Sequence, residues 1–182
     1  MQTKISILNY RNVVEINGPD NRDFLNNILT NDITQMANDE VYQTALLTPQ
    51  GKILFDLLIF NDIQSKAIFL ECSQEQIDEV VKKLKLYSIR KDVIINKTDL
   101  NVLITNNLKF SNNVKTDNRF FKFKMGRIYL DSKEIKHKSY GKFESELLWY
   151  KEEKIRNCVP EGEKEIPSNK IFPFEIGIFN KN

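Results

Sequence analysis

The sequence lacks several features that membrane proteins and many enzymes need. No apolar run is long enough to span a bilayer, and the N-terminus lacks the apolar core of a secretion signal. The two cysteines, Cys72 and Cys158, have no CxxC spacing, and the single histidine, His137, lies between lysines, which favours a solvated side chain. No phosphate-binding glycine loop, nucleophile elbow or HExxH motif occurs. We therefore expect a globular cytoplasmic protein with no metal site.

Positive and negative charges nearly balance. The 27 lysines and arginines against 25 aspartates and glutamates give no sign of polyanion binding. One segment, residues 119–127, interleaves aromatic and basic side chains and has two interpretations. Lys122, Lys124 and Arg127 would contact single-stranded RNA if the aromatic rings stacked on bases. Alternatively the segment is a strand whose phenylalanines face a core while its lysines face water.

Changes of hydrophobic period along the chain predict an α+β protein. One helix is expected after an N-cap at Asp20, and a second after a capping box formed by Ser73 and Gln76, ending near Tyr87. A third helix is expected over residues 139–155. Because helices and strands do not alternate regularly, we expect antiparallel sheets with helices on one face, as in ferredoxin-like subdomains. Strands are predicted at residues 5–8 and 13–16, as an antiparallel pair, and at 42–47, 52–60, 66–72, 93–95, 102–105, 120–125 and 128–130.

A single carboxylate, Asp56, lies inside the apolar run of residues 46–60, which a turn at residues 48–51 divides into two strands. In an extended strand Asp56 shares one face with Leu54 and Leu58, and the opposite face is apolar as well. A carboxylate there needs hydrogen bonds or a ligand, because burial raises its pKa. Asp56 is therefore either a functional group or a structural carboxylate, and the residues alone leave both interpretations open.

Several short motifs occur in a characteristic order. They are Gly18-Pro19-Asp20 with Phe24-Leu25, Thr30-Asn31-Asp32, Leu46-Leu47-Thr48-Pro49-Gln50-Gly51-Lys52 with Asp56, Tyr87-Ser88-Ile89-Arg90-Lys91-Asp92-Val93, Asp117-Asn118-Arg119 followed by Gly126 and Arg127, and Val159-Pro160-Glu161. In order and spacing they resemble the YgfZ-type folate-binding proteins, which are relatives of the glycine-cleavage T-protein (aminomethyltransferase). The resemblance covers essentially the whole chain.

This resemblance implies a tetrahydrofolate-binding body over residues 1–182. Residues 106–116, which are polar and rich in asparagine, are a candidate loop or seam between two subdomains. It also implies a role in the maturation of iron-sulfur enzymes, including ones that modify tRNA, with those enzymes as partners. Arg90 is suited to hold the glutamate tail of a folate, because a guanidinium binds a carboxylate bidentately. The residues that the resemblance places around a folate cleft are Thr30, Asn31, Asp32, Asp56, Glu71, Tyr87 and Arg90.

The sequence departs from the family pattern in two places. T-protein carries two adjacent aspartates, the first implicated in catalysis, and here Phe55 occupies the first position and Asp56 the second. Neighbouring strand residues point to opposite faces, so Asp56 cannot replace the missing aspartate. The chain also stops before the family's Lys-Gly-Cys-Tyr-x-Gly-Gln-Glu motif and C-terminal barrel, and Cys158 is not the cysteine of that motif. We expect the cleft left open in this way to favour a homodimer.

These observations predict a folate-binding accessory protein without aminomethyltransferase chemistry. A first alternative is a tetrahydrofolate-dependent one-carbon transferase or demethylase in which Asp56 polarises the reacting groups. A second alternative is an RNA-contacting module.

Overall fold

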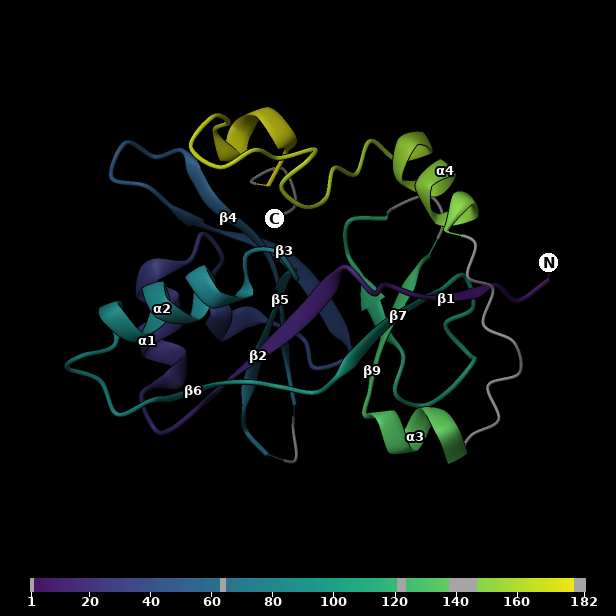
Figure 1. Cartoon of the computed structure of the whole chain (residues 1–182), viewed down its shortest axis with the longest axis horizontal. Coiled ribbons are helices and arrows are strands. Elements are labelled where there is room, and N and C mark those ends of the chain that lie inside the picture. The colour runs from purple at the N-terminus through teal and green to yellow at the C-terminus, as the bar shows by residue number, and fades with distance from the viewer. Residues whose placement is uncertain (1, 63–64, 121–123, 138–146, 179–182) are drawn as a thin grey trace.

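The computed structural model describes residues 2–62, 65–120, 124–137 and 147–178, and the described strands join into one mixed sheet (Figure 1). The strand order is β1-β7-β9-β8-β3-β4-β5-β2-β6, and β3 and β8 pair in parallel. The strands are β1 (Ile5–Ile7), β2 (Arg11–Asn17), β3 (Glu40–Leu47), β4 (Ile53–Asn61), β5 (Ile68–Ser73), β6 (Ile94–Lys97), β7 (Asn101–Thr105), β8 (Lys115–Asp117) and β9 (Gly126–Leu130). The helices are α1 (Asn21–Ile28), α2 (Ile77–Tyr87), α3 (Ser132–His137) and α4 (Leu148–Arg156), with 3-10 turns η1 (Ile33–Gln35) and η2 (Pro173–Ile176). We call β3, β4, β5, β2 and β6 the first half of the sheet and β1, β7, β9 and β8 the second half.

The first two strands do not pair with each other, so the predicted N-terminal antiparallel pair is wrong. β1 pairs with β7, whereas β2 lies between β5 and β6 in the other half of the sheet. The turn between them is tight, with the Arg11 N–H donating to the Leu8 carbonyl over 2.9 Å, and Leu8 itself is bonded to Val102. The chain therefore passes from one half of the sheet to the other instead of folding back into a hairpin.

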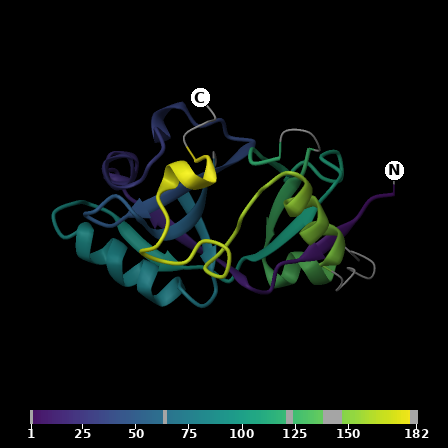
Figure 2. The ribbon, with the colours of Figure 1, turned by 90° about the horizontal axis from the view of Figure 1, so that it is seen from above.

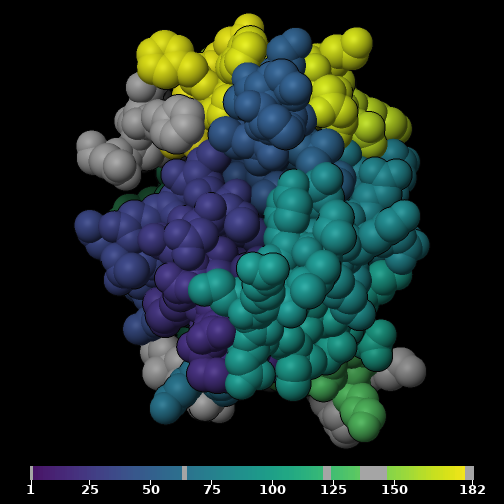
Figure 3. Space-filling view, turned by 90° about the vertical axis from the view of Figure 1, so that its left-hand side faces the viewer, coloured from purple at the N-terminus to yellow at the C-terminus, as the bar shows by residue number. Residues whose placement is uncertain are grey.

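Helices α1 and α2 cover one face of the first half of the sheet. Phe24 and Leu25 of α1 and Val80 and Leu84 of α2 are buried in a cluster with the apolar side chains of β2, β4 and β5. An amphipathic helix is stabilised mainly by burying its apolar face. The apolar side chains spaced at the helical period in the sequence are the ones buried here, and for this reason the spacing predicted both helices. Figure 3 views this end of the molecule, where α1 and the α2–β6 segment lie side by side.

Both predicted helices are confirmed, and Asp20 is the N-cap residue of α1 as predicted, but the predicted capping box of α2 is wrong, and neither N-cap side chain bonds to its own helix. The N-cap position of α2 is Gln76, and the Ser73 hydroxyl instead accepts a bond from the Glu75 N–H. Asp20 precedes α1, but its carboxylate accepts from the Asp92 N–H over 2.8 Å, which ties α1 to the turn before β6. In both cases a tertiary or turn contact uses the side chain that a local cap would require.

A second apolar cluster fills the space between the two halves of the sheet. It contains Leu58 and Phe60 of β4, Val102 and Ile104 of β7, and Tyr150 of α4, on the face opposite α1 and α2. After α4, residues 157–172 cross from the second half of the sheet to the first, as Figures 1 and 2 show. We call residues 157–172 the crossing segment.

Two predicted elements of the second half differ from the structure. The described residues of the 120–125 segment are not in a strand, and β8 precedes that segment at Lys115–Asp117. Residues 121–123, and with them Lys122, lie outside the described part of the chain. The described part of the predicted 139–155 helix is α4, since residues 138–146 are not described. Within the described ranges, no helix combines the length and the apolar character that crossing a membrane requires.

Helix α4 ends in a left-handed residue that is not glycine. Cys158 has φ = 52°, while the Val159 N–H donates to the Lys154 carbonyl over 2.9 Å and the Cys158 N–H to the Ile155 carbonyl over 3.2 Å. These two bonds form a Schellman motif, whose left-handed position strongly favours glycine. Cys158 is therefore strained by its own Cβ.

We expect Cys158→Gly to raise the free energy of unfolding by up to about 1 kcal/mol. The left-handed conformation costs an L-residue about 1–2 kcal/mol, which glycine avoids. Glycine also has more conformational freedom in the unfolded chain, and this offsets about half of the stabilisation. Urea unfolding of Cys158→Gly beside Cys158→Ala, which keeps the Cβ, measures the effect. Equal stability of the two variants would contradict the assignment of strain.

Candidate functional site

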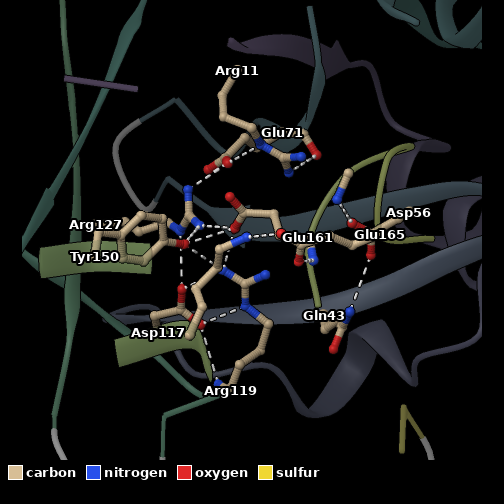
Figure 4. A network of polar contacts seen from close by, with 12 residues as sticks. Arg11, Gln43, Asp56, Glu71, Asp117, Arg119, Arg127, Tyr150, Glu161 and Glu165 are labelled. Atoms are coloured by element: carbon tan, nitrogen blue, oxygen red, sulfur yellow. Dashed lines mark hydrogen bonds and ion pairs between the residues drawn. The ribbon is translucent and has the colours of Figure 1, made fainter. Parts of the chain in front are cut away.

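Six charged side chains lie together in the interior where the two halves of the sheet meet, and we call them the ion cluster (Figure 4). Its cations are Arg11 of β2, Arg119 of the turn after β8, and Arg127 of β9, and its anions are Glu71 of β5, Asp117 of β8, and Glu161 of the crossing segment. The cluster therefore joins both halves of the sheet and the crossing segment. Three cations face three anions, so its formal charges balance.

Arg127 is the central cation of the ion cluster. Its Nη1 lies 2.5 Å from a Glu71 oxygen and its Nε 3.0 Å from an Asp117 oxygen, while Nη2 pairs with Glu161. Arg119 binds Asp117 through two nitrogens, at 2.9 and 2.7 Å. A guanidinium can make these forked contacts because its donors lie in one rigid plane.

Two tyrosines complete the hydrogen bonding of the carboxylates. The Tyr150 hydroxyl donates to Glu161 over 2.9 Å, and the Tyr129 hydroxyl donates to Glu71 over 2.8 Å. Among the described residues, Nη1 of Arg11 and Nη1 of Arg119 are buried guanidinium nitrogens without a hydrogen-bond partner. The carboxylates of the ion cluster thus have hydrogen-bond donors, whereas two guanidinium N–H groups of the cluster have no acceptor among the described residues.

The surroundings lower the pKa of two buried carboxyl groups and raise the pKa of a third. Burial by itself would raise the pKa of Asp117 and of Glu161, but the neighbouring guanidinium groups outweigh it and hold both pKa values below the ordinary range. Burial raises the pKa of Asp56, and the guanidinium of Arg11 only partly opposes this. Asp117 and Glu161 therefore stabilise the folded state as anions, whereas ionised Asp56 costs stability.

These shifts predict a two-part dependence of stability on pH. Asp117 and Glu161, with depressed pKa values, contribute stability that is present above their ordinary pKa of about 4 and is lost as the pH falls through their folded values. Asp56, with a raised pKa, contributes with the opposite sign, so its protonation adds stability as the pH falls through its folded pKa toward the ordinary value of about 4. Urea midpoints at several pH values should rise slightly and then fall steeply below about pH 4. In Asp56→Asn the slight rise should disappear, and a rise that persists there would contradict the assignment to Asp56.

Asp56 is buried and satisfied by two protein donors. The Gln43 amide donates to Oδ1 over 3.1 Å, and the Gly162 N–H of the crossing segment donates to Oδ2 over 3.0 Å. The predicted alternation holds from Asp56 onward, with Leu58 in the cluster between the halves. It fails before Asp56, because a bulge places Leu46 opposite Phe55 but Leu47 opposite Ile53.

A pocket of about 930 Å³ opens beside the ion cluster, and we call it the α4 pocket. It is lined by Tyr10, by Leu147, Lys151, Lys154 and Ile155 at α4, by the turn of residues 73–75, and by residues 158–165 of the crossing segment. Glu161 belongs to the pocket wall and to the ion cluster at once, and the Tyr10 hydroxyl donates to it over 3.3 Å. The pocket thus combines apolar side chains with three lysines, two of them on α4, and with four glutamates, of which Glu161 belongs to the ion cluster.

Of the residues predicted to surround a folate cleft, Asp56 and Glu71 lie near each other. Both belong to the sheet face that carries the ion cluster, where Glu71 pairs in register with Leu58. Arg11 acts on both, by an ion pair of 2.6 Å with Glu71 and by its charge on Asp56. Their oxygens are directed at protein partners within the structure.

The Thr30-Asn31-Asp32 motif lies elsewhere, at the end of α1. The Thr30 hydroxyl accepts from the Ala45 N–H over 3.0 Å, and Asp32 caps η1 through the Thr34 N–H at 2.9 Å. Asn31 is half-buried, and within the described part of the chain its buried side-chain oxygen has no partner. Thr30 and Asp32 therefore have structural partners within the chain.

Tyr87 and Arg90 lie at the end of α2, a helix that packs on the sheet face opposite the ion cluster. Both are exposed, and the Lys83 ammonium lies 5.2 Å from the ring centre of Tyr87. The structure thus does not bring them to Asp56 and Glu71. None of the seven predicted residues is among the described residues that line the α4 pocket, so their role in folate binding stays a prediction separate from that pocket.

Sequence reasoning assigned no role to Arg11, and it carried Asp117, Arg119 and Glu161 only as parts of motifs. A local signal existed, because Glu71 and Arg127 interrupt apolar strands just as Asp56 does. Their partners could not be read from the sequence, since Glu71 and Arg127 are 56 residues apart. Arg127 is fully buried, so its guanidinium is not exposed for the RNA contact that the second alternative assigned to it.

Comparison with solved structures identifies the architecture. The chain superposes on the glycine cleavage system aminomethyltransferase T from Bartonella henselae with a TM-score of 0.62 and 10% identity, covering 75% of this chain and 44% of that one. The fold is that of the aminomethyltransferase. This confirms the predicted α+β class, with one correction, since α4 lies on the face opposite α1 and α2.

Sequence comparison finds two fungal relatives. The chain is 25% identical over 95 residues to the mitochondrial iron-sulfur cluster assembly factor IBA57 homologue of Neurospora crassa, and 25% identical over 103 residues to that of Chaetomium globosum. The matches cover 50% and 47% of this chain but 22% and 24% of the relatives, so the chain spans about a quarter of their length. No family model matches the chain. Together the comparisons show the fold of the aminomethyltransferase and a partial sequence similarity to iron-sulfur cluster assembly factors.

Proposed function

We propose that this protein is a folate-binding accessory factor in iron-sulfur protein maturation, and that it binds tetrahydrofolate in the α4 pocket. The observation that carries the folate part is the α4 pocket itself, about 930 Å³ and lined by apolar side chains and by lysines of α4. Pockets of several hundred Å³ with mostly apolar walls and a few placed polar groups are typical of small-molecule sites. The family that the sequence resembles binds tetrahydrofolate, which joins a flat ring system to an anionic tail.

The residues of the α4 pocket fit both parts of such a ligand. Tyr10 and Val159 offer apolar surface for a ring, and Lys151 and Lys154 offer positive charge for the tail carboxylates. The buried Lys154 donates to Glu165 over 2.8 Å, which leaves two further ammonium donors for a ligand. Bound tetrahydrofolate would supply one-carbon chemistry in an enzyme of this family, whereas the chain's own residues bind and orient it here.

Absence of transferase chemistry is supported by Phe55. The resemblance puts the catalytic aspartate of T-protein at this position, and here the ring is buried with Leu57 and Ile59 in the cluster under α1 and α2. Asp56, the remaining carboxylate, already accepts from Gln43 and Gly162. We therefore propose that the protein binds folate without transferring an aminomethyl group, in the manner of the YgfZ-type proteins that its sequence resembles.

The iron-sulfur part of the proposal rests on the two fungal relatives, which are named as iron-sulfur cluster assembly factors. Iron-sulfur client enzymes, including ones that modify tRNA, are the partners that this role implies. A cytoplasmic location stays a prediction, because both relatives are described as mitochondrial. A homodimer stays a prediction too, and the exposed Leu148 and Ile155 of α4 supply apolar surface for it beside the pocket.

Calorimetric titration with tetrahydrofolate under anaerobic conditions tests the binding part. We expect saturable binding in the micromolar range, weakened about fivefold by Lys151→Met, which removes one exposed charge from the pocket. Lys170→Met, at an exposed lysine outside the pocket, should leave the affinity unchanged. No saturable binding up to high micromolar concentration would contradict the proposal. Aminomethyl transfer that Asp56→Asn abolishes without loss of affinity would favour the transferase alternative.

A further inference from the structure

The wall of the α4 pocket is held by a bond within the crossing segment and by bonds to buried residues on other elements. The Glu161 carboxylate accepts from Arg119 over 2.7 Å, and the Glu161 N–H donates to the Glu165 carboxylate over 2.9 Å. Glu165 in turn pairs with Lys154 of α4. Between these anchors, the Gly162 N–H is bonded to Asp56 on β4.

Asp56 is a rigid anchor because the sheet fixes it. Asp56 of β4 pairs in register with Ala45 of β3 and accepts a hydrogen bond from Gln43, which is also on β3. Gly162, its other partner, lies 106 residues away in the chain. Gly162 has φ = 76°, a left-handed conformation that lets its N–H serve this bond, and its carbonyl accepts from the Ile166 N–H over 2.8 Å. The bond from Gly162 to Asp56 therefore ties the start of this turn directly to the sheet.

We propose that Asp56 is a positioning residue, which fixes the Gly162 wall of the α4 pocket from beneath and does not itself touch the ligand. This inference rests on the proposed function for the identity of the ligand, but the contact between Asp56 and Gly162 is independent of it. Its basis is that both Asp56 oxygens are used by protein donors and that Asp56 is not among the residues lining the pocket.

Arg11 lies under the same turn. A Cβ added to Gly162 would lie 3.9 Å from Nη1 of Arg11, the nitrogen that has no partner in the described part of the chain. Among the neighbouring groups, the Arg11 charge is the one that most favours the ionised form of Asp56. An ionised acceptor makes the stronger bond to the Gly162 N–H, so Arg11 supports the anchor without contacting Gly162 through a bond of its own.

Amide hydrogen exchange of the Gly162 N–H, measured by NMR in the full chain, tests the inference directly. In Asp56→Ala we expect this amide to exchange at least about tenfold faster, because its acceptor is gone. The amides of β1 and β7, at the edge of the sheet away from β4, should be unchanged and serve as the control for intact folding. Asp56→Asn keeps an oxygen for the Gly162 N–H and an amide for a turned Gln43, so it should restore protection.

Tetrahydrofolate titration of the same variants separates this inference from the proposed function. If wild type binds, we expect about tenfold weaker binding in Asp56→Ala and near-normal binding in Asp56→Asn. A wild type that does not bind would overturn the proposed function, while accelerated Gly162 exchange in Asp56→Ala would still support the anchor. Unchanged Gly162 exchange in Asp56→Ala, or wild-type affinity in that variant, would overturn the positioning role.

Discussion

Replacing Arg127 by methionine should lower the free energy of unfolding by about 3–5 kcal/mol. The variant keeps most of the apolar volume of the arginine stem but removes the cation that Glu71, Asp117 and Glu161 share. Breaking a buried ion pair from one side is this costly because the remaining charges are left desolvated and uncompensated. Urea or thermal unfolding monitored by circular dichroism measures the loss.

A surface arginine provides the matched control. Arg156 also pairs with two acids, Glu152 and Glu153, but the guanidinium itself and Glu152 are exposed on α4 and Glu153 is half-buried, so solvent screens the pairs. Arg156→Met should therefore change the free energy of unfolding by no more than about 0.5 kcal/mol. A loss in Arg127→Met as small as that of the control would contradict the structural importance of the ion cluster.

Substituting alanine for Gly18 should cost about 3 kcal/mol or more. Gly18 has φ = 109°, and a Cβ there would overlap the carbonyl oxygen of Asp92, which is backbone and cannot turn away. The variant therefore combines a strained backbone conformation with overpacking, each of which costs about 1–3 kcal/mol. The same turn carries the Asp20–Asp92 bond that ties α1 to β6, so the effect should appear as global destabilisation.

Gly51→Ala separates the two contributions. Gly51 also has a positive φ, 81°, but a Cβ there would meet nothing nearer than a Phe172 ring carbon at 4.0 Å. This variant should cost only the conformational strain, about 1–2 kcal/mol. Equal losses at Gly18 and Gly51, measured by urea unfolding, would show that the backbone of Asp92 moves aside freely.

Local patterns in the sequence predicted the elements better than their pairing. The helical stripe of α2 and the alternation after Asp56 are local, and both appear in the structure. The partner of β1 was missed because nothing near residues 5–7 encodes a strand that lies about a hundred residues further along the chain. The capping box at Ser73 failed because a turn contact competed for the same hydroxyl.

In the candidate site, too, the sequence indicated local features better than long-range contacts. A charge within an apolar strand, as at Asp56 or Glu71, can be recognised from the sequence as a group that needs partners. Which partners it finds is a tertiary property, set by strand order and by a crossing segment that is irregular in structure. The α4 pocket was missed for this reason, since Tyr10, Lys154 and Glu161 meet only after the crossing segment has packed onto the sheet.

Protection of Cys158 by tetrahydrofolate tests the central claim most directly, because this exposed thiol lines the α4 pocket. Cys72 is an internal control, since it is buried and its burial raises its pKa to about 12, which keeps it unreactive in the folded protein. The rate of Cys158 alkylation by iodoacetamide is measured while tetrahydrofolate is increased through the range of its binding. A rate that falls and saturates with the binding curve is the predicted result. A rate that stays constant while the protein becomes saturated with tetrahydrofolate would place the ligand elsewhere and contradict the account.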